Sequence, residues 1–317
     1  MDALYNAAKP RVVAIGGPTA TGKTALSVAL AKRFGGEIIS ADSMQIYQGL
    51  DVGTAKVTPE EMQGVPHHLV GFLAPEQAFS VADFTTLAGK TITQLTAQGK
   101  LPLVVGGTGL YITSLLNGIG FTPEKVDPAI RQELQARLQA EGSQALYAEL
   151  AAVDPGYAAK VHPNNTPRVI RALELYRATG RKMSAEREAA RPAEKPYRSL
   201  CLCLTCRDRT LLYQRIDTRC DRMMQSGILE EAKLVYDHRD TYRTAAQAIG
   251  YKEFFPYFEG TADLESCLAH LKQASRNYAK RQLTWFRHME GVVWLDAGAP
   301  DVRQTAIRTV SEFLAKG

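Results

Sequence analysis

The sequence lacks the features of secreted and membrane-spanning proteins. Its 317 residues include only five cysteines, too few and too uneven a number for a disulfide framework. No apolar run reaches the roughly 18 residues that cross a bilayer, and the chain does not open with a basic stretch followed by an apolar one. These absences predict a protein of the reducing cytoplasm without membrane association.

A strong charge of one sign is also missing. The formal net charge is +5, from 38 basic and 33 acidic residues, and by itself indicates no partner. The surplus is local, however. Basic residues predominate in 160–198, and 272–287 contains basic but no acidic residues. Two such stretches are typical of a polyanion-binding surface, although solvated helix faces would give the same pattern.

The first 120 residues indicate strands alternating with helices. Short apolar stretches predict strands at 11–17, 37–40 and 101–107, and an alanine-rich stretch at 24–34 has helical spacing. Near-continuous apolar strands separated by helices are typical of a buried parallel sheet. The predicted fold class is therefore α/β.

The pattern changes near Phe121–Pro123, where helical spacing of apolar residues begins and continues to about residue 187. The elements expected after it are strands at 197–206 and 291–296 and helices at about 208–238 and 262–289. We therefore predict a discontinuous α/β core of residues 1–120 and 198–317, interrupted by an inserted all-helical domain at 121–197.

A phosphate-binding motif follows the first predicted strand. It reads Gly17-Pro18-Thr19-Ala20-Thr21-Gly22-Lys23-Thr24, which fits G-x4-G-K-[ST] and leads into a predicted helix. Backbone N–H groups and the helix N-terminus would face a di- or triphosphate. Lys23 would neutralise its outer oxygens and Thr24 would ligate Mg2+. The core is thus predicted to be a P-loop NTPase-like sheet.

An acidic residue that usually accompanies such a loop is missing at its expected place. The predicted strand 101–107 ends in glycines, and the nearest acid at a strand end is Asp42. This carboxylate suits a ligand of metal or water, or a general base close to the phosphates, and it also suits a simple helix N-cap.

The motifs along the chain resemble those of the tRNA dimethylallyltransferase family, the bacterial tRNA isopentenyltransferases. The resemblance covers nearly the whole chain, with the motifs in the family's order. Besides the phosphate loop, they are Asp42-Ser43-Met44-Gln45-Ile46-Tyr47, Gly53-Thr54-Ala55-Lys56, Pro66-His67-His68-Leu69, Ser80-Val81-Ala82-Asp83-Phe84, Gly106-Gly107-Thr108-Gly109-Leu110-Tyr111, Pro167-Arg168-Val169-Ile170-Arg171-Ala172-Leu173-Glu174, Gln247-Ala248-Ile249-Gly250-Tyr251-Lys252-Glu253 and Ala279-Lys280-Arg281-Gln282-Leu283-Thr284-Trp285-Phe286-Arg287.

The resemblance implies a Mg2+-dependent prenyl transfer. The dimethylallyl group of dimethylallyl diphosphate would move to N6 of adenosine 37, beside the tRNA anticodon, and diphosphate would leave. The residues suit this chemistry, because Asp42 can accept the N6 proton and cations can neutralise the leaving group. Thr19 and Thr108 are implied active-site positions. Either Arg215 or Arg219 would reach the diphosphate, a choice that the sequence leaves open.

Gripping an anticodon stem-loop requires contacts on both sides of the unstacked base. The resemblance and the two basic stretches imply the following contacts to tRNA: Asp42, Ser43, Met44, Gln45, Arg131, Pro167, Arg168, Val169, Ile170, Arg171, Gln247, Gly250, Tyr251, Lys252, Arg276, Lys280 and Arg281. A monomer in the cytoplasm is the family expectation.

Several alternatives remain open at this point. A small-molecule kinase shares the phosphate loop, and an adenylate isopentenyltransferase, which acts on free AMP, resembles the same family. The local basic stretches argue against both, and the Gly106–Tyr111 motif without an acid also argues against the kinase. Cys201 and Cys203 alternate with leucines on one strand, which favours buried thiols over a zinc site. Trp285 is expected either to stack on a base or to pack in the core.

Overall fold

The structure is a computed structural model that describes residues 9–121, 127–190, 192 and 194–316. The chain divides into two compact units. One, the α/β unit, contains the residues up to Leu116 and those from Pro196 onward, and the other, the helical unit, is Asn117–Lys195. The predicted change of character near Phe121–Pro123 falls partly on 122–126, outside the described residues.

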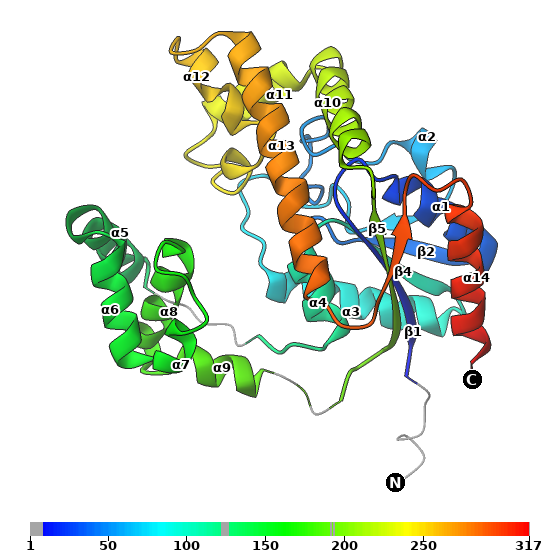
Figure 1. The fold of residues 1–317 in the computed structure, drawn as a ribbon, viewed down its shortest axis with the longest axis horizontal. Helices are drawn as coiled ribbons and strands as arrows, with labels where there is room; N and C mark the ends of the chain where they lie inside the picture. The colour runs from blue at the N-terminus through cyan, green and yellow to red at the C-terminus, as the bar shows by residue number, and fades with distance from the viewer. Residues whose placement is uncertain (1–8, 122–126, 191, 193, 317) are drawn as a thin grey trace. The chain divides into compact units, whose positions relative to one another are not determined.

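The α/β unit is built on a six-stranded parallel sheet, which confirms the predicted fold class (Figure 1). The strand order is β3-β2-β4-β1-β5-β6. The strands are β1 (Arg11–Gly16), β2 (Gly36–Ser40), β3 (His67–His68), β4 (Leu101–Val105), β5 (Arg198–Thr205) and β6 (Val292–Asp296). The sequence pattern missed only β3, because two residues at the sheet edge give no periodicity. Since β5 pairs with β1, the sheet joins the chain on either side of the insertion.

Nine α-helices and two 3-10 turns are described in this unit. The helices are α1 (Lys23–Phe34), α2 (Pro59–Met62), α3 (Val81–Ala97), α4 (Gly109–Leu116), α10 (Arg209–Gln225), α11 (Ile228–Asp237), α12 (Phe255–Phe258), α13 (Leu264–Arg287) and α14 (Val302–Ala315), and the 3-10 turns are η1 (Ala245–Gln247) and η2 (Lys252–Phe254). The single helix expected at 208–238 is two helices, because Gly227 takes a left-handed φ of 92° between α10 and α11. No helix among the described residues combines the length and hydropathy that a membrane span requires.

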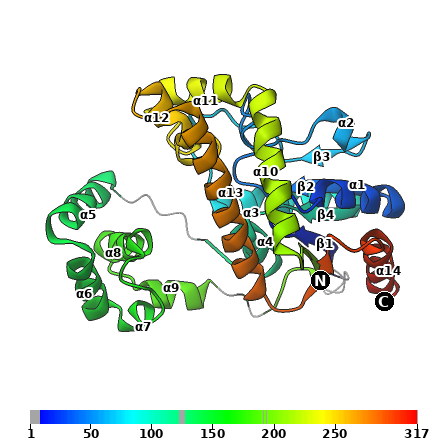
Figure 2. The same ribbon diagram turned by 45° about the horizontal axis from the view of Figure 1, so that its top comes forward.

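Alternate residues of the strands pack on opposite faces of the sheet. On β1, Val13 and Ile15 face α1 and α14, whereas Val12 and Ala14 face α3 and α4. All four side chains are fully buried, so β1 forms the centre of a three-layer core. A further apolar cluster joins α10, α11 and α13 to residues 46–50 (Figure 2). This cluster holds the C-terminal helices beside the loop that follows β2.

The helical unit contains α5 (Pro128–Glu141), α6 (Ser143–Val153), α7 (Pro155–Ala158), α8 (Thr166–Thr179) and α9 (Met183–Ala189). Asp127 caps α5 by accepting a hydrogen bond from Ala129 N, and Pro128 occupies its first turn, where a missing N–H costs nothing. Leu134, which is fully buried, packs with residues of α6 and α8 in a core of its own. The unit therefore has the hydrophobic centre expected of a separate domain.

Candidate active site

The phosphate motif forms a loop between β1 and α1. Gly17 and Gly22 have φ values of 134° and 82°, and Ala20 is also left-handed at 63°. A Cβ on Gly17 would lie 2.5 Å from the carbonyl oxygen of Leu204, so only glycine fits there. The hydroxyl of Thr21 donates to Pro18 O at 2.7 Å and closes the loop. The backbone thereby curves around the start of α1, as phosphate binding requires.

Two cations lie at this loop, and neither forms an ion pair with a carboxylate of the residues that the structure describes. Lys23 Nζ donates to Pro18 O at 2.7 Å, and Nη1 of Arg219, from α10, donates to Thr19 Oγ1 at 2.6 Å. Burial, together with the neighbouring Arg219 charge, lowers the pKa of Lys23 to about 8. Burial also lowers the pKa of Arg219, although Asp42 acts in the opposite sense. These positive charges are poorly solvated and suit a diphosphate.

The two candidate arginines are placed differently. Arg219 contacts the phosphate loop directly, whereas Arg215 Nη1 donates to Ala297 O at 3.4 Å. Arg215 lines a cavity of about 450 Å³ together with Ala20 and Gly22 of the loop. Asp217, on the same helix as Arg215, binds Arg276 of α13.

Asp42 lies on the loop after β2, beside the loop after β4. Ala41 N donates to Val105 O at 2.7 Å, and Thr108 N donates to Ala41 O at 3.2 Å. Thr108 Oγ1 in turn accepts from Ser43 N at 3.1 Å. Gly106 permits this approach, because a Cβ there would lie 2.1 Å from Ala41 O. The two loops are therefore joined by backbone and hydroxyl hydrogen bonds.

The Asp42 carboxylate is half-buried and uses only one oxygen for local structure. Oδ1 accepts from Met44 N at 2.9 Å and Gln45 N at 3.3 Å, whereas Oδ2 accepts nothing from the residues that the structure describes. Its charge is close enough to Lys23 and Arg219 to raise the pKa of both. A carboxylate with one free oxygen thus adjoins the cations of the phosphate loop.

Helix α13 contributes a residue that sequence reasoning did not select. Gln282 is 5% exposed; its Oε1 accepts from Thr19 N at 3.0 Å, and its Nε2 donates to Gly107 O at 3.0 Å. It lies within the quoted motif at 279–287, but a motif does not say which face of a helix meets the site. Trp285 packs against Gly109 and donates from Nε1 to Thr113 Oγ1 at 3.0 Å. Of the two roles expected for this residue, the structure shows packing rather than a ring free to stack on a base.

The motif at 247–253 anchors the segment that carries Gly53. The side chain of Tyr251 is fully buried and packs against Gly53, and its hydroxyl donates to Glu231 at 2.7 Å. The Glu231 carboxylate also accepts three backbone N–H groups of residues 51–53. The structure therefore reassigns Tyr251 from RNA contact to packing. Gly250 is buried too, whereas Gln247 and Lys252 are exposed.

Other predicted contacts serve the structure as well. The Gln45 amide donates to the carbonyls of Thr54 and Ala55, which fixes the loop that carries Asp42. Lys272 and Arg276, two basic residues of the stretch 272–287, form ion pairs with Asp221 and Asp217 of α10 at 2.6 and 2.8 Å. Part of this basic stretch is therefore paired within the protein.

Lys280 and Arg281 of α13 are both exposed. Lys280 lies 6.0 Å from the ring of Tyr213, and Arg281 lies 5.5 Å from the ring of Tyr278. Burial, with the charge of Asp42 nearby, raises the pKa of Tyr278 to about 12, so this phenol is neutral. This end of α13 therefore combines exposed positive charge with aromatic rings, a pattern that suits single-stranded RNA.

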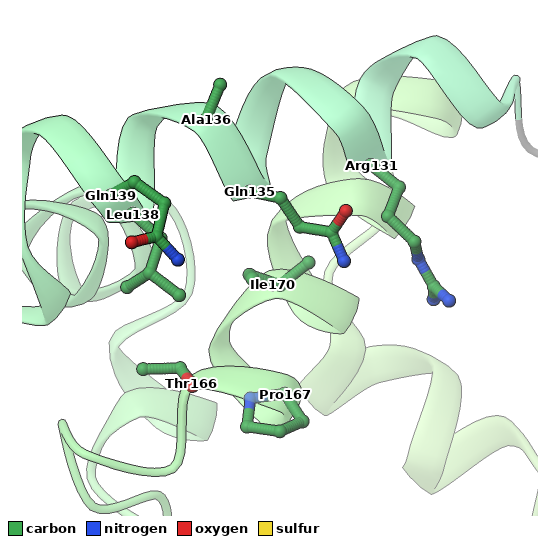
Figure 3. A pocket seen from close by; sticks show the side chains of 8 residues that line it. All are labelled: Arg131, Gln135, Ala136, Leu138, Gln139, Thr166, Pro167 and Ile170. Atoms are coloured by element: carbon green, nitrogen blue, oxygen red, sulfur yellow. The ribbon is translucent and has the colours of Figure 1, made fainter. Parts of the chain in front are cut away.

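The predicted RNA residues of the helical unit divide into surface and core. Val169 and Ile170 are buried in the core of α8, so the structure reassigns the Val169 side chain from RNA contact to packing. Pro167 and Arg168 are exposed at the start of α8. A cavity of about 540 Å³ lies between α5 and α8. Its lining residues, shown in Figure 3, are Arg131, Gln135, Ala136, Leu138, Gln139, Thr166, Pro167 and Ile170.

Arg131 and Arg171 share one carboxylate. Glu174 accepts from Arg131 Nη2 at 2.8 Å and from Arg171 Nη1 at 3.0 Å, while both guanidinium groups stay about half exposed. Burial acts to raise the pKa of Glu174, but the two arginines hold it below its ordinary value. Arg131 therefore connects α5 to α8, and both arginines still present charge to solvent.

The cysteines are free and buried. Burial raises the pKa of Cys201 to about 12, so this thiol stays protonated. No group of three or more potential metal-ligating side chains of His, Cys, Asp and Glu occurs within the described part of the chain. The buried-thiol interpretation therefore stands.

Comparison with known families gives two overlapping matches. The sequence model of a family described as IPP transferase matches residues 45–289, and that of a family described as Isopentenyl transferase matches residues 10–70. Among curated proteins, the tRNA dimethylallyltransferase of Bacillus subtilis (strain 168) is 50% identical over 295 residues, which is 93% of each chain. The enzyme of that name from Geobacillus thermodenitrificans is 46% identical over 96% of each chain.

Solved structures agree with these matches. A tRNA isopentenylpyrophosphate transferase from Bacillus halodurans is 45% identical, has a TM-score of 0.72, and aligns over 96% of this chain and 97% of its own. A eukaryotic dimethylallyltransferase acting on tRNA is 32% identical, has a TM-score of 0.80, and aligns over 96% of this chain and 79% of its own. The chain is similar to both over nearly its full length.

Proposed function

The chain belongs to the tRNA dimethylallyltransferase family, and from that premise we propose that it prenylates adenosine 37 of tRNA. The donor is dimethylallyl diphosphate, and the acceptor atom is N6 of the adenine beside the anticodon. The products are N6-isopentenyladenosine and diphosphate. Neither of the two rival functions, phosphoryl transfer by a kinase and prenylation of free AMP, requires the basic residues that we propose below to bind RNA.

The observation that carries this proposal is the position of Asp42 beside the cations of the phosphate loop. Its charge raises the pKa of both Lys23 and Arg219. Through Ser43 and Thr108 its loop is hydrogen-bonded to the loop after β4. Transfer of an allylic group needs this combination, because the leaving diphosphate requires positive charge and the attacking amine must lose a proton.

The residues divide the reaction between them. N–H groups of the phosphate loop, Lys23 and Arg219 bind the diphosphate and stabilise the charge that grows on it as the allylic C–O bond breaks. The adenine N6 forms the new C–N bond, and its proton passes to Asp42. Thr19, whose oxygen accepts from Arg219, keeps its hydroxyl proton to donate to a diphosphate oxygen. Thr108 orients the backbone next to Asp42.

We propose Mg2+ as the cofactor, held mainly by the diphosphate. The protein offers a fitting oxygen donor for this ion, because Thr24 lies in the first turn of α1 directly after Lys23 of the phosphate loop. Mg2+ is commonly bound by one or two protein oxygens together with substrate phosphates. When bound, the ion supplies additional neutralisation of the leaving group.

The RNA partner is proposed to be the anticodon stem-loop. Its backbone is bound by Arg168, by the half-exposed Arg131 and Arg171, and by Lys280 and Arg281 of the α/β unit. Adenosine 37 must leave the stack to reach Asp42, at a cost of a few kcal/mol that such backbone contacts offset. We also propose that the enzyme acts as a monomer in the cytoplasm, which sedimentation and cell fractionation test.

One reaction tests the function. Unmodified tRNA carrying adenosine 37 is incubated with the protein, dimethylallyl diphosphate and Mg2+, and the digested nucleosides are weighed by mass spectrometry. We expect an isopentenyl adduct on adenosine that disappears when Mg2+ is chelated. A matched tRNA with guanosine at position 37 gives no adduct. Product formed on AMP but not on tRNA, or consumption of ATP, would replace the proposal with one of its rivals.

A further inference from the structure

We propose that Gln282 is a positioning residue that keeps two loops in register, the phosphate loop on the donor side and, on the acceptor side, the loop after β4 that is hydrogen-bonded to the loop of Asp42. The inference rests on the proposed function, since it assigns these loops to the donor and the acceptor of one reaction. Gln282 projects from α13, a helix far from both loops in sequence, and touches each of them. No other described side chain hydrogen-bonds to both loops.

The contacts use the whole amide. Oε1 accepts from Thr19 N at 3.0 Å, and Nε2 donates to Gly107 O at 3.0 Å. The side chain is 5% exposed, so water does not compete for either bond. A buried amide that lost its partners would carry the full cost of desolvation, and both loops are therefore held to the positions that satisfy it.

The surroundings accept glutamine and little else. A Cβ on Gly107 would lie 2.1 Å from Nε2, so the absence of a side chain there makes room for the amide. Glutamate has no N–H to donate to Gly107 O, and asparagine is one methylene shorter. Methionine has nearly the same length and volume but makes neither bond. The pair of loops thus requires a donor and an acceptor at the end of a side chain of this length.

The bonded atoms lie on the two sides of the reaction. Thr19, held by Gln282 at its N–H, is held by Arg219 at its hydroxyl oxygen, at 2.6 Å. Gly107 precedes Thr108, which accepts from Ser43 N next to Asp42. Hydrogen bonds therefore run from the diphosphate side to the general base through a single side chain. A displacement of about 1 Å between donor and acceptor can cost on the order of a hundredfold in rate.

The test separates positioning from folding. In Q282M, kcat at saturating dimethylallyl diphosphate and tRNA is expected to fall about tenfold to a hundredfold. Both KM values should stay within about threefold of wild type, and the melting temperature should stay well above that of the assay. A kcat within twofold of wild type would overturn the inference, as would a loss confined to KM or to melting temperature. Q282E keeps the hydrogen bond from Thr19 N and loses only the one to Gly107 O. It therefore tests the contact to Gly107 separately, and it remains available if Q282M does not fold.

A second variant makes the assignment specific. Gly107→Ala puts a methyl group where Nε2 lies and should lower kcat as Q282M does. The double variant should lose no more than Q282M alone, because the amide that the methyl displaces is already gone. If the decreases in kcat of the two single variants multiplied in the double variant, the assignment would be contradicted. Gln273 is the matched control, since it is exposed on the same helix and, among the described residues, hydrogen-bonds to Asn277 and Arg276 and to neither loop, so Q273M should leave kcat unchanged.

The same assays separate this inference from the function on which it rests. Wild-type protein that gives no isopentenyl adduct on tRNA would overturn the proposed function, and the inference with it. Normal transfer by wild type, Q282M and Q273M alike would overturn the inference alone.

Discussion

Arginines of the helical unit bind carboxylates of neighbouring helices, whereas the cations of the phosphate loop bind neutral oxygens. In the helical unit, Arg137 and Arg177 share Glu149 just as two other arginines share Glu174. In the α/β unit, Lys23 donates to a carbonyl and Arg219 to a hydroxyl. The arginines of the first group form ion pairs, whereas the hydrogen bonds of Lys23 and Arg219 to described residues go to uncharged oxygens.

This difference separates structural charge from functional charge. Ion pairs between half-exposed groups connect helices at a small net gain. Lys23 and Arg219 instead donate to neutral oxygens close to Asp42, an arrangement that suits the binding of a diphosphate. Counting basic residues along a sequence cannot distinguish the two kinds, because the distinction lies in what each side chain contacts.

The sharpest test of the comparison removes the base rather than a cation. Asp42→Asn should lower transfer by about a thousandfold, in the range typical for loss of a general base. Its affinity for tRNA should change by less than about threefold, because the amide keeps the turn to Met44 N. Single-turnover rates and filter binding measure the two quantities. Unaltered turnover would remove Asp42 from the mechanism.

The next test compares the two arginines of α10. Arg219→Ala should lower kcat by about a hundredfold, a typical loss for one group that stabilises charge in the transition state. Arg215→Ala should lower it by less than about tenfold, since its guanidinium binds Ala297 O beside the loop. A larger loss in the Arg215 variant would reverse the assignment.

A pH series examines Lys23. Its pKa of about 8 lies below its ordinary value, so the free protein loses this charge as the pH rises through about 8. Affinity for dimethylallyl diphosphate should then fall about tenfold per pH unit above that value. Calorimetric titration measures this affinity. Lys23→Met cannot lose a proton at this position, so its affinity should show no such decrease above pH 8. Equal slopes in the two proteins would mean that Lys23 does not titrate.

In the helical unit, Glu174→Gln should cost about 1 kcal/mol of unfolding free energy, because both partner arginines are half exposed. The pKa of Glu174 is lower in the folded protein than its ordinary value of 4.5. The pairing therefore stabilises the unit above that pH, and this stability is lost as the pH falls through the folded pKa. Denaturant unfolding at pH 7 and pH 4 checks both statements, with the exposed Glu188→Gln as control.

The smallest expected effect is at the RNA surface. Arg168→Glu should weaken tRNA binding by about threefold to tenfold and reduce the salt slope by about one, as loss of one phosphate contact does. Arg308→Glu makes the same charge change on α14 and should alter neither. If both variants behave alike, net charge rather than a specific contact determines affinity.

The fold was largely readable from residue patterns. The buried runs of β1, β4 and β5 gave a clear parallel-sheet signal, and the glycines with Lys23 identified the phosphate loop. The break between α10 and α11 was not anticipated, because one glycine in a helical pattern is compatible with continuation. The edge strand His67–His68 was too short to detect.

The site was predicted less completely. Asp42 and Thr108 could be named from motifs, but the choice between Arg215 and Arg219 depends on which side of α10 meets the loop. Helical spacing cannot resolve that choice without the position of the neighbouring strand. Tyr251 lies in a distinctive motif, which predicts an RNA contact. A motif residue that packs in the core has the same appearance in a sequence, so the two roles cannot be distinguished there. Gln282 was missed for the converse reason, since a polar residue on a basic helix looks like surface.

The discontinuous sheet has a consequence for how the protein is made. Strand β1 is synthesised early, yet its neighbour β5 is translated only after the whole insertion. Arg219 and Gln282 come later still. A ribosome that has completed the phosphate loop has therefore made a nascent chain that lacks half of its donor site. Any product truncated before α13 should be inactive on tRNA, so only chains made almost to the end can modify it.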